Sequence, residues 1–216
     1  MLQYKLTRFH AGFELWGNVA SLVRLHEFIH RVVNESSYIK DKEGFILSLA
    51  YDVRKAYEGM RKKELREPND TDNSSIYGVP VLWPAVLVQT SILRYSMSFM
   101  ELSKLDQSIM FELEYIVETA LKQASPKEAD ELIHRIWHIG SSSYDHIAAV
   151  LDSRIQFFVG LEPKQRLKML PMLIDTFEPM YDWLAKDGNP LPQGMLPPSS
   201  FAENDSGWSI EDDFKW

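Results

Sequence analysis

The residues with the clearest chemical potential form the pentapeptide His26-Glu27-Phe28-Ile29-His30, which matches the H-E-x-x-H pattern of zinc peptidases. Residues four apart lie on one face of a helix, so His26 and His30 could bind one metal ion. Glu27 would then lie beside them and activate a bound water. The pattern by itself therefore indicates a metal-dependent hydrolase.

The helix around this pentapeptide argues against a catalytic metal. Its apolar stripe consists of other residues, and the two histidines fall at the edge of that stripe: Leu22, Leu25, Ile29, Val32 and Val33. Glu27 falls on the far side, near two arginines at surface ion-pair spacing. Only twenty-five residues precede the pentapeptide, where similar peptidases have a sheet subdomain, and no motif places a third ligand. We therefore predict boundary histidines and no cofactor.

Two other groups of residues resemble parts of active sites. His134 and His138 have the same spacing, but they point away from the apolar face of their helix, which favours exposed histidines. The serines at 141–143 lie close to His146, yet no G-x-S-x-G elbow is present, so helix capping explains them better than catalysis.

The end of the chain, residues 189–216, combines prolines, acidic residues and large apolar side chains. From Asp187 onward six acidic residues and one lysine give a net charge of −5, out of −8 for the whole chain. A segment too polar to fold alone but carrying Trp208, Phe214 and Trp216 is typical of a tail that docks through aromatic anchors. The docking surface is either the chain's own domain or a partner, and both alternatives stay open.

The segment 45–57 fits a strand and a helix equally well. We favour a strand over 45–54, because the apolar segment 76–83 is also expected to be a strand and needs a neighbour. On such a strand Asp52, Arg54 and Tyr57 could line a polar groove. The alternative is cross-strand ion pairing on a solvated sheet face.

Composition excludes several classes of protein. The 216 residues are 45% hydrophobic, which is enough for one core, and they include no cysteine and no apolar run long enough to cross a membrane. The acidic balance without a basic face argues against a nucleic-acid partner. The alternating N-terminus lacks a signal-peptide layout, so we expect a cytoplasmic protein.

The remaining pattern predicts an α+β fold. A hairpin from strands at 2–7 and 13–16 leads into a helix capped by Asn18, and a polar loop at 67–74 precedes the strand at 76–83. Proline, glycine and capping signals, including a capping box at Ser125, then divide the chain into helices near 84–100, 105–123, 125–140, 141–159, 163–178 and 179–188. We expect one domain at 1–188, with a sheet part at 1–83 and a helical part at 84–188, and a tail at 189–216.

Two blocks, at 49–59 (LAYDVRKAYEG) and 77–84 (YGVPVLWP), resemble a family of uncharacterised bacterial proteins. The likeness covers about residues 1–180 and not the tail. It implies a bacterial source and no assigned activity, and it transfers no functional residues.

Together these patterns favour a non-enzymatic cytosolic binding or protein-interaction module. Its partner would be a protein or a second copy of the chain, engaged through the tail. The alternative is the metal-dependent hydrolase built on residues 26–30.

Overall fold

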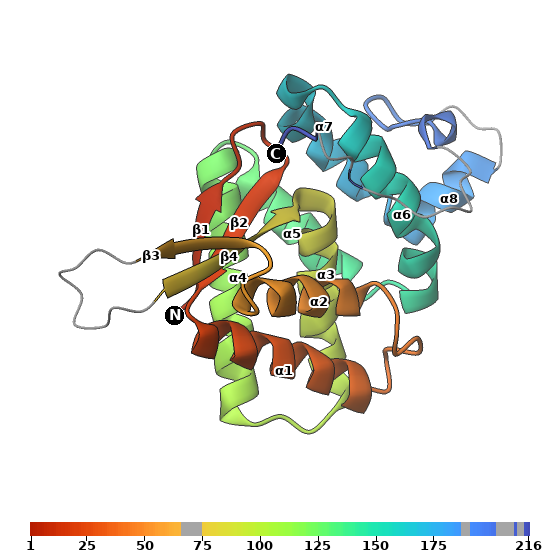
Figure 1. Cartoon of the computed structure of the whole chain (residues 1–216). Coiled ribbons are helices and arrows are strands. Elements are labelled where there is room, and N and C mark those ends of the chain that lie inside the picture. The colour runs from red at the N-terminus through yellow and green to blue at the C-terminus, as the bar shows by residue number, and fades with distance from the viewer. Residues whose placement is uncertain (66–74, 187–190, 202–209, 211–213) are drawn as a thin grey trace.

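Four antiparallel strands form a sheet in the order β1-β2-β4-β3, and helices pack around it (Figure 1). The computed structural model of the chain describes residues 1–65, 75–186, 191–201, 210 and 214–216. The strands are β1 (Gln3–Leu6), β2 (Gly12–Gly17), β3 (Lys62–Leu65) and β4 (Ser75–Leu82). The α+β fold is therefore confirmed, as is the opening hairpin.

The β1–β2 turn depends on two short-range features. The Thr7 hydroxyl donates to the carbonyl oxygen of Gly12 at 2.9 Å and accepts from its N–H at 3.0 Å. His10 adopts a left-handed conformation with a φ of 60°, which closes the turn. Gly12 then lies directly against β4, where it pairs with Leu82.

Helices α1 (Val19–Glu35) and α2 (Ile46–Tyr57) lie side by side below the sheet (Figure 1). The prediction of the α1 start is confirmed, because the Asn18 side chain accepts from the Ser21 N–H at 2.8 Å. The predicted strand over 45–54 is wrong, since this segment is helical. Its buried residues repeat at helical spacing: Ile46, Leu49, Ala50, Val53 and Ala56.

β4 instead pairs with β2 on one side and with β3 on the other, and the four residues of β3 are all exposed. This short edge strand pairs through its backbone and carries lysines, as edge strands commonly do. The predicted loop at 67–74 lies outside the described residues.

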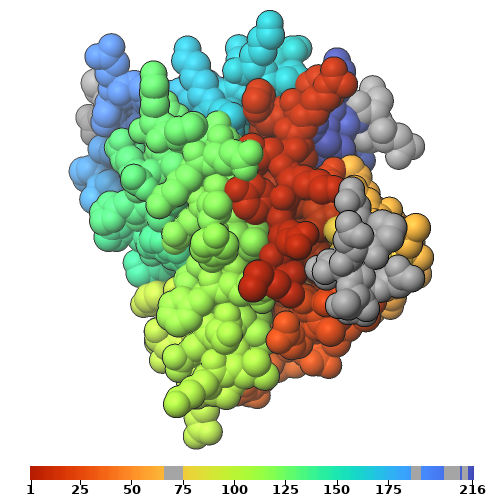
Figure 2. All heavy atoms as spheres, turned by 90° about the vertical axis from the view of Figure 1, so that its left-hand side faces the viewer, coloured from red at the N-terminus to blue at the C-terminus, as the bar shows by residue number. Residues whose placement is uncertain are grey.

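The helical part surrounds α3 (Trp83–Ser96), which is buried on nearly all sides. It continues into the 3₁₀ turn η1 (Met97–Phe99). The other elements are α4 (Lys104–Ala124), α5 (Ala129–Ile139), α6 (Tyr144–Gly160), α7 (Pro163–Asp175), α8 (Pro179–Lys186) and the 3₁₀ turn η2 (Pro198–Ser200). In Figure 2 the N-terminal strand region runs beside α4, and the Leu2 N–H donates to Glu112 at 2.6 Å.

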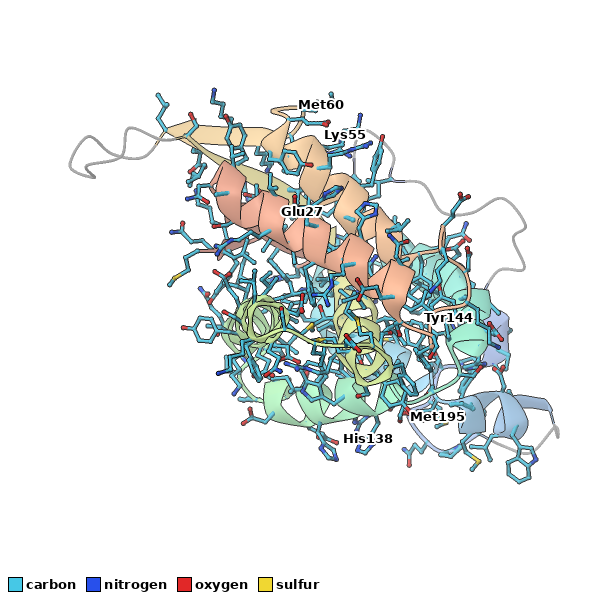
Figure 3. The ribbon with its side chains drawn as sticks, turned by 90° about the horizontal axis from the view of Figure 1, so that it is seen from below. Glu27, Lys55, Met60, His138, Tyr144 and Met195 are labelled. Atoms are coloured by element: carbon cyan, nitrogen blue, oxygen red, sulfur yellow. The ribbon has the colours of Figure 1, made fainter. Side chains whose placement is uncertain are left out.

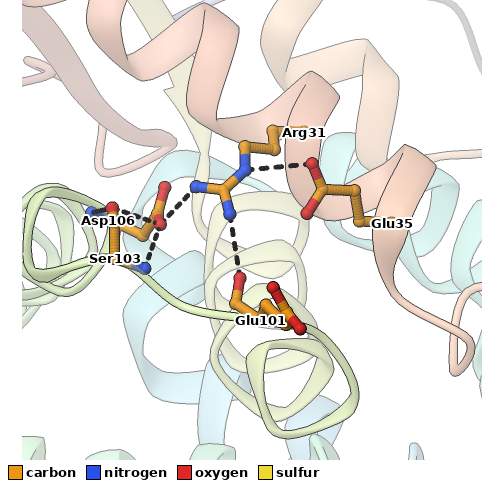
Figure 4. A network of polar contacts seen from close by, with 5 residues as sticks. All are labelled: Arg31, Glu35, Glu101, Ser103 and Asp106. Atoms are coloured by element: carbon orange, nitrogen blue, oxygen red, sulfur yellow. Dashed lines mark hydrogen bonds and ion pairs between the residues drawn. The ribbon is translucent and has the colours of Figure 1, made fainter.

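The capping box predicted at Ser125 is absent, because α5 begins only at Ala129 and its N-cap is Glu128. A capping box occurs instead at the start of α4, where Ser103 and Asp106 satisfy each other's backbone N–H groups. Arg31 of α1 extends it, binding the Asp106 carboxylate and donating to the Glu101 carbonyl oxygen at 2.8 Å (Figure 4). This network joins α1 to the start of α4.

Candidate functional site

The H-E-x-x-H residues lie on α1 beside α2. His26 and His30 are half-buried, with ring centroids 4.5 Å apart, and the Tyr57 ring of α2 meets His26 edge-on at 5.8 Å. Burial and the neighbouring charges of His30 and Arg54 lower the pKa of His26. Glu27 is exposed on the outer side of the helix (Figure 3).

No three histidine, aspartate or glutamate side chains converge on a metal-sized position within the described part of the chain. Two imidazoles on one helix supply only two of the three protein ligands that a catalytic zinc site uses. We therefore expect protein purified without added zinc to contain less than about a tenth of an equivalent of metal by elemental analysis. A stoichiometric metal that disappears in His26→Ala and persists in the surface control His138→Ala would contradict this expectation.

The second histidine pair lies on the exposed face of α5, with the two Nε2 atoms 3.2 Å apart, and His138 points away from the body of the molecule (Figure 3). Near the serines, the His146 Nδ1 lies 3.6 Å from an Asp182 oxygen of α8. Ser143 occupies the N-cap position of α6 but makes no side-chain capping bond, so the predicted serine cap does not form.

The residues of the predicted polar groove are distributed around α2. Asp52 accepts from Arg61 at 2.9 Å, the Arg54 guanidinium lies 5.3 Å from the Tyr51 ring, and Tyr57 contacts His26. The strand that would have aligned these side chains does not exist, because this segment is helical.

The tail residues Phe214 and Trp216 pack against the chain's own core. The Phe9 N–H, in the β1–β2 turn, donates to the Trp216 carbonyl oxygen at 2.8 Å. Phe214 and Trp216 meet edge-on at 5.2 Å. We call the surface on which the tail packs the tail seat. It consists of Phe9, Arg166 of α7 and a pocket beside Trp216. Trp208 lies outside the described residues.

Arg166 of α7 holds the tail seat together. Its side chain is buried, and its Nη1 donates to the carbonyl oxygens of Phe9, at 3.1 Å, and Lys215. The guanidinium lies 4.5 Å from the centre of the Phe214 ring, which is a cation–π arrangement. Burial lowers the pKa of Arg166, although an arginine remains charged at neutral pH. A buried charge that binds two carbonyl groups fixes the turn and the tail relative to each other.

A pocket of about 140 Å³ lies between α2, β4, α3 and the tail, and Trp216 connects it to the part of the tail that Arg166 binds. Trp216 and Ile210 line one side, and Asp52 and Gln89 contribute polar atoms. The Gln89 amide is buried and donates to the Phe45 carbonyl oxygen at 2.9 Å and to the Ser48 hydroxyl at 2.8 Å. One of the predicted groove residues and one of the predicted tail anchors thus share a pocket.

The comparison with protein families matches residues 2–216 to the family described as Domain of unknown function (DUF6904). The chain belongs to this family. Because the match extends to residue 216, the DUF6904 domain includes the tail, whereas the resemblance in the sequence stopped near residue 180. No curated protein and no solved structure is detectably similar to the chain. The described helices include none that is long and apolar enough to cross a bilayer.

Sequence reasoning did not identify Arg166 as part of the DUF6904 tail seat. A signal was present, because Arg166 occupies the first position of the buried stripe that continues with Leu170, Leu173 and Ile174 of α7. An arginine in an apolar stripe needs a buried partner, and here the partners are carbonyl groups of two distant segments.

Proposed function

We propose that this chain is a non-enzymatic protein-interaction module of the bacterial cytoplasm, with its C-terminal tail as the docking element. The observation that carries the proposal is the tail seat, in which a buried arginine binds the Phe214 ring and the Lys215 carbonyl group, and Trp216 lines an incompletely filled pocket. Aromatic side chains in partly desolvated pockets supply most of the binding energy in many interfaces.

The partner that fits this seat best is a second copy of the chain. The seat already matches its own tail, so the same residues from a neighbouring copy would make identical contacts by exchange. Phe214, Trp216 and Ile210 are only partly buried, which leaves part of each side chain accessible for a further contact. The tail would then stabilise the monomer at low concentration and connect two copies at high concentration.

We expect removal of residues 190–216 to lower the melting temperature and to abolish any dimer seen by light scattering. For the point variant Trp216→Ala, which tests the same contact without shortening the chain, we expect a loss of about 4 °C in a protein of this size. Circular dichroism and size-exclusion chromatography with light scattering measure both quantities.

Trp183→Ala is the matched control, because Trp183 is an exposed tryptophan on α8 outside the seat. Its melting temperature should remain within about 1 °C of the parent value. If neither the truncation nor Trp216→Ala changed melting temperature or mass, the tail would not be a docking element.

The alternative of a metal-dependent hydrolase at residues 26–30 gains no support from the geometry. His26 packs on Tyr57, and no third ligand joins the two imidazoles within the described ranges.

A further inference from the structure

A second cavity, of about 400 Å³, lies where α3, α4 and α5 meet, and it takes no part in the tail seat. This volume falls within the range of small-molecule sites. We call it the α3–α4–α5 groove. Its walls contain three aromatic rings and several polar side chains: Ser91, Arg94, Tyr95, Phe111, Glu114, Glu118 and Trp137.

The aromatic walls are suited to a positively charged group. The Arg94 guanidinium already lies 4.7 Å from the centre of the exposed Phe111 ring, so one cation occupies this ring within the chain itself. Aromatic faces carry negative electrostatic potential and attract ammonium and guanidinium groups. Tyr95 and Trp137 provide further ring surface on the walls of the same groove.

The charges in and beside the groove do not cancel. Two of the three guanidinium nitrogens of Arg94, Nε and Nη2, donate to the two carboxylate oxygens of Glu114. Lys122 lies 3.2 Å from Asp130. The two cations, Arg94 and Lys122, are thus paired with the carboxylates of Glu114 and Asp130. Glu118 is a third carboxylate, which leaves one negative charge in excess.

Glu118 has no cationic nitrogen within ion-pair distance in the described part of the chain. Burial, and then the nearby charge of Glu114, raise the pKa of Glu118, and the charge of Lys122, which is paired with Asp130, only partly opposes them. An ionised carboxylate that is partly removed from water without a direct ion pair is destabilised, and a cation placed beside it relieves that cost.

We propose that the α3–α4–α5 groove binds a small organic ammonium ion with an apolar or aromatic body. Glu118 supplies the opposite charge, and Tyr95, Phe111 and Trp137 contact the ammonium and the body. An organic anion does not fit, because the nearest cation, Arg94, is already bound on two nitrogens by Glu114. A bare metal ion does not fit either, since no group of three ligating side chains forms among the described residues.

Isothermal titration calorimetry on the full chain at low ionic strength tests this proposal. The probes are benzylamine and benzyltrimethylammonium, with benzyl alcohol as the uncharged analogue and benzoate as the anion. We expect both cations to bind with a dissociation constant on the order of 1 mM, and both other probes to bind at least about ten times more weakly.

Glu118→Gln keeps the size and hydrogen-bonding shape of the side chain but removes its charge. We expect it to weaken binding of the two cations about tenfold, whereas Glu101→Gln, at an exposed carboxylate outside the groove, leaves it unchanged. Trp137→Leu should weaken binding as well and leave the Glu118 carboxylate in place. Equal cation affinity in the parent and in Glu118→Gln, or equal affinity for benzylamine and benzyl alcohol, would overturn the proposal.

Discussion

Gly12→Ala is expected to lower the free energy of unfolding by about 4 kcal/mol, at the upper end of single-substitution effects. The reason is the close approach of β2 and β4 at this position. A Cβ atom on residue 12 would lie 1.8 Å from the carbonyl oxygen of Val81 and 2.9 Å from its carbonyl carbon. Both are backbone atoms, so no side-chain rotation relieves the clash and the two strands must separate. Chemical denaturation followed by circular dichroism measures the loss.

Gly160→Ala is the matched control for this prediction. Gly160 is the last residue of α6, and apart from its chain neighbours and the backbone of its own helix no heavy atom lies within 4 Å of the position its Cβ would occupy. We expect a change of at most about 0.5 kcal/mol, with stabilisation the favoured direction, because alanine restricts the unfolded chain. Similar losses in the two variants would show that the contact with Val81 is not the cause.

The second large effect is expected for Asp106→Ala, which should cost about 2 kcal/mol. The substitution removes the capping box of α4 and the carboxylate to which Arg31 binds (Figure 4). Asp106 is only 5% exposed, so water does not replace these hydrogen bonds freely. Urea denaturation at neutral pH measures this difference in stability.

The contribution of Asp106 should depend on pH in one direction. Burial alone would raise the pKa of Asp106, but hydrogen bonds from the Ser103 hydroxyl and N–H and from Arg31 outweigh it, so the pKa lies below its ordinary value. Because the pKa of Asp106 is lower in the folded chain than in the unfolded chain, the ionised carboxylate stabilises the fold. This stabilisation is fully present at pH values above the unfolded-state pKa of about 3.9. That stabilisation is lost as the pH falls through the folded-state pKa. The difference between parent and Asp106→Ala should therefore shrink on acidification below about pH 4.

Asp130→Ala provides the comparison, because the Asp130 side chain is 90% exposed and pairs with Lys122 at the surface. We expect its removal to cost at most about 0.5 kcal/mol. A loss as large as that of Asp106→Ala would mean that helix-terminal charge, and not the buried network, determines the effect.

The elements that the sequence predicts correctly are those with local signals. Asn18 caps α1 through its own side chain, and the prolines at 84, 163 and 179 lie in the first turns of their helices. The error at α2 has a physical cause, because its apolar residues satisfy two periodicities and the choice depended on which strands would pair with β4. Those strands are β2 and the edge strand β3, and β3 has no apolar alternation, since its exposed residues pair only through the backbone.

The candidate sites show the same limit. Composition pointed to Phe214 and Trp216, because large aromatic residues stand out in an acidic segment. Arg166, which binds the Phe214 ring and the Lys215 carbonyl group, is 49 residues away from Lys215, so no local pattern connects the arginine to the tail. The α3–α4–α5 groove is assembled from three helices, and the charge imbalance around Glu118 exists only after these helices have packed.

The bond between Phe9 and Arg166 has a consequence for biosynthesis. The two residues are 157 positions apart, so at about 5–20 residues per second the first turn leaves the ribosome on the order of 10–30 s before its arginine. During that interval the nascent hairpin lacks the donor for its Phe9 carbonyl group. Water supplies that hydrogen bond instead, so the connection between the first turn and α7 forms only after most of the chain has been made.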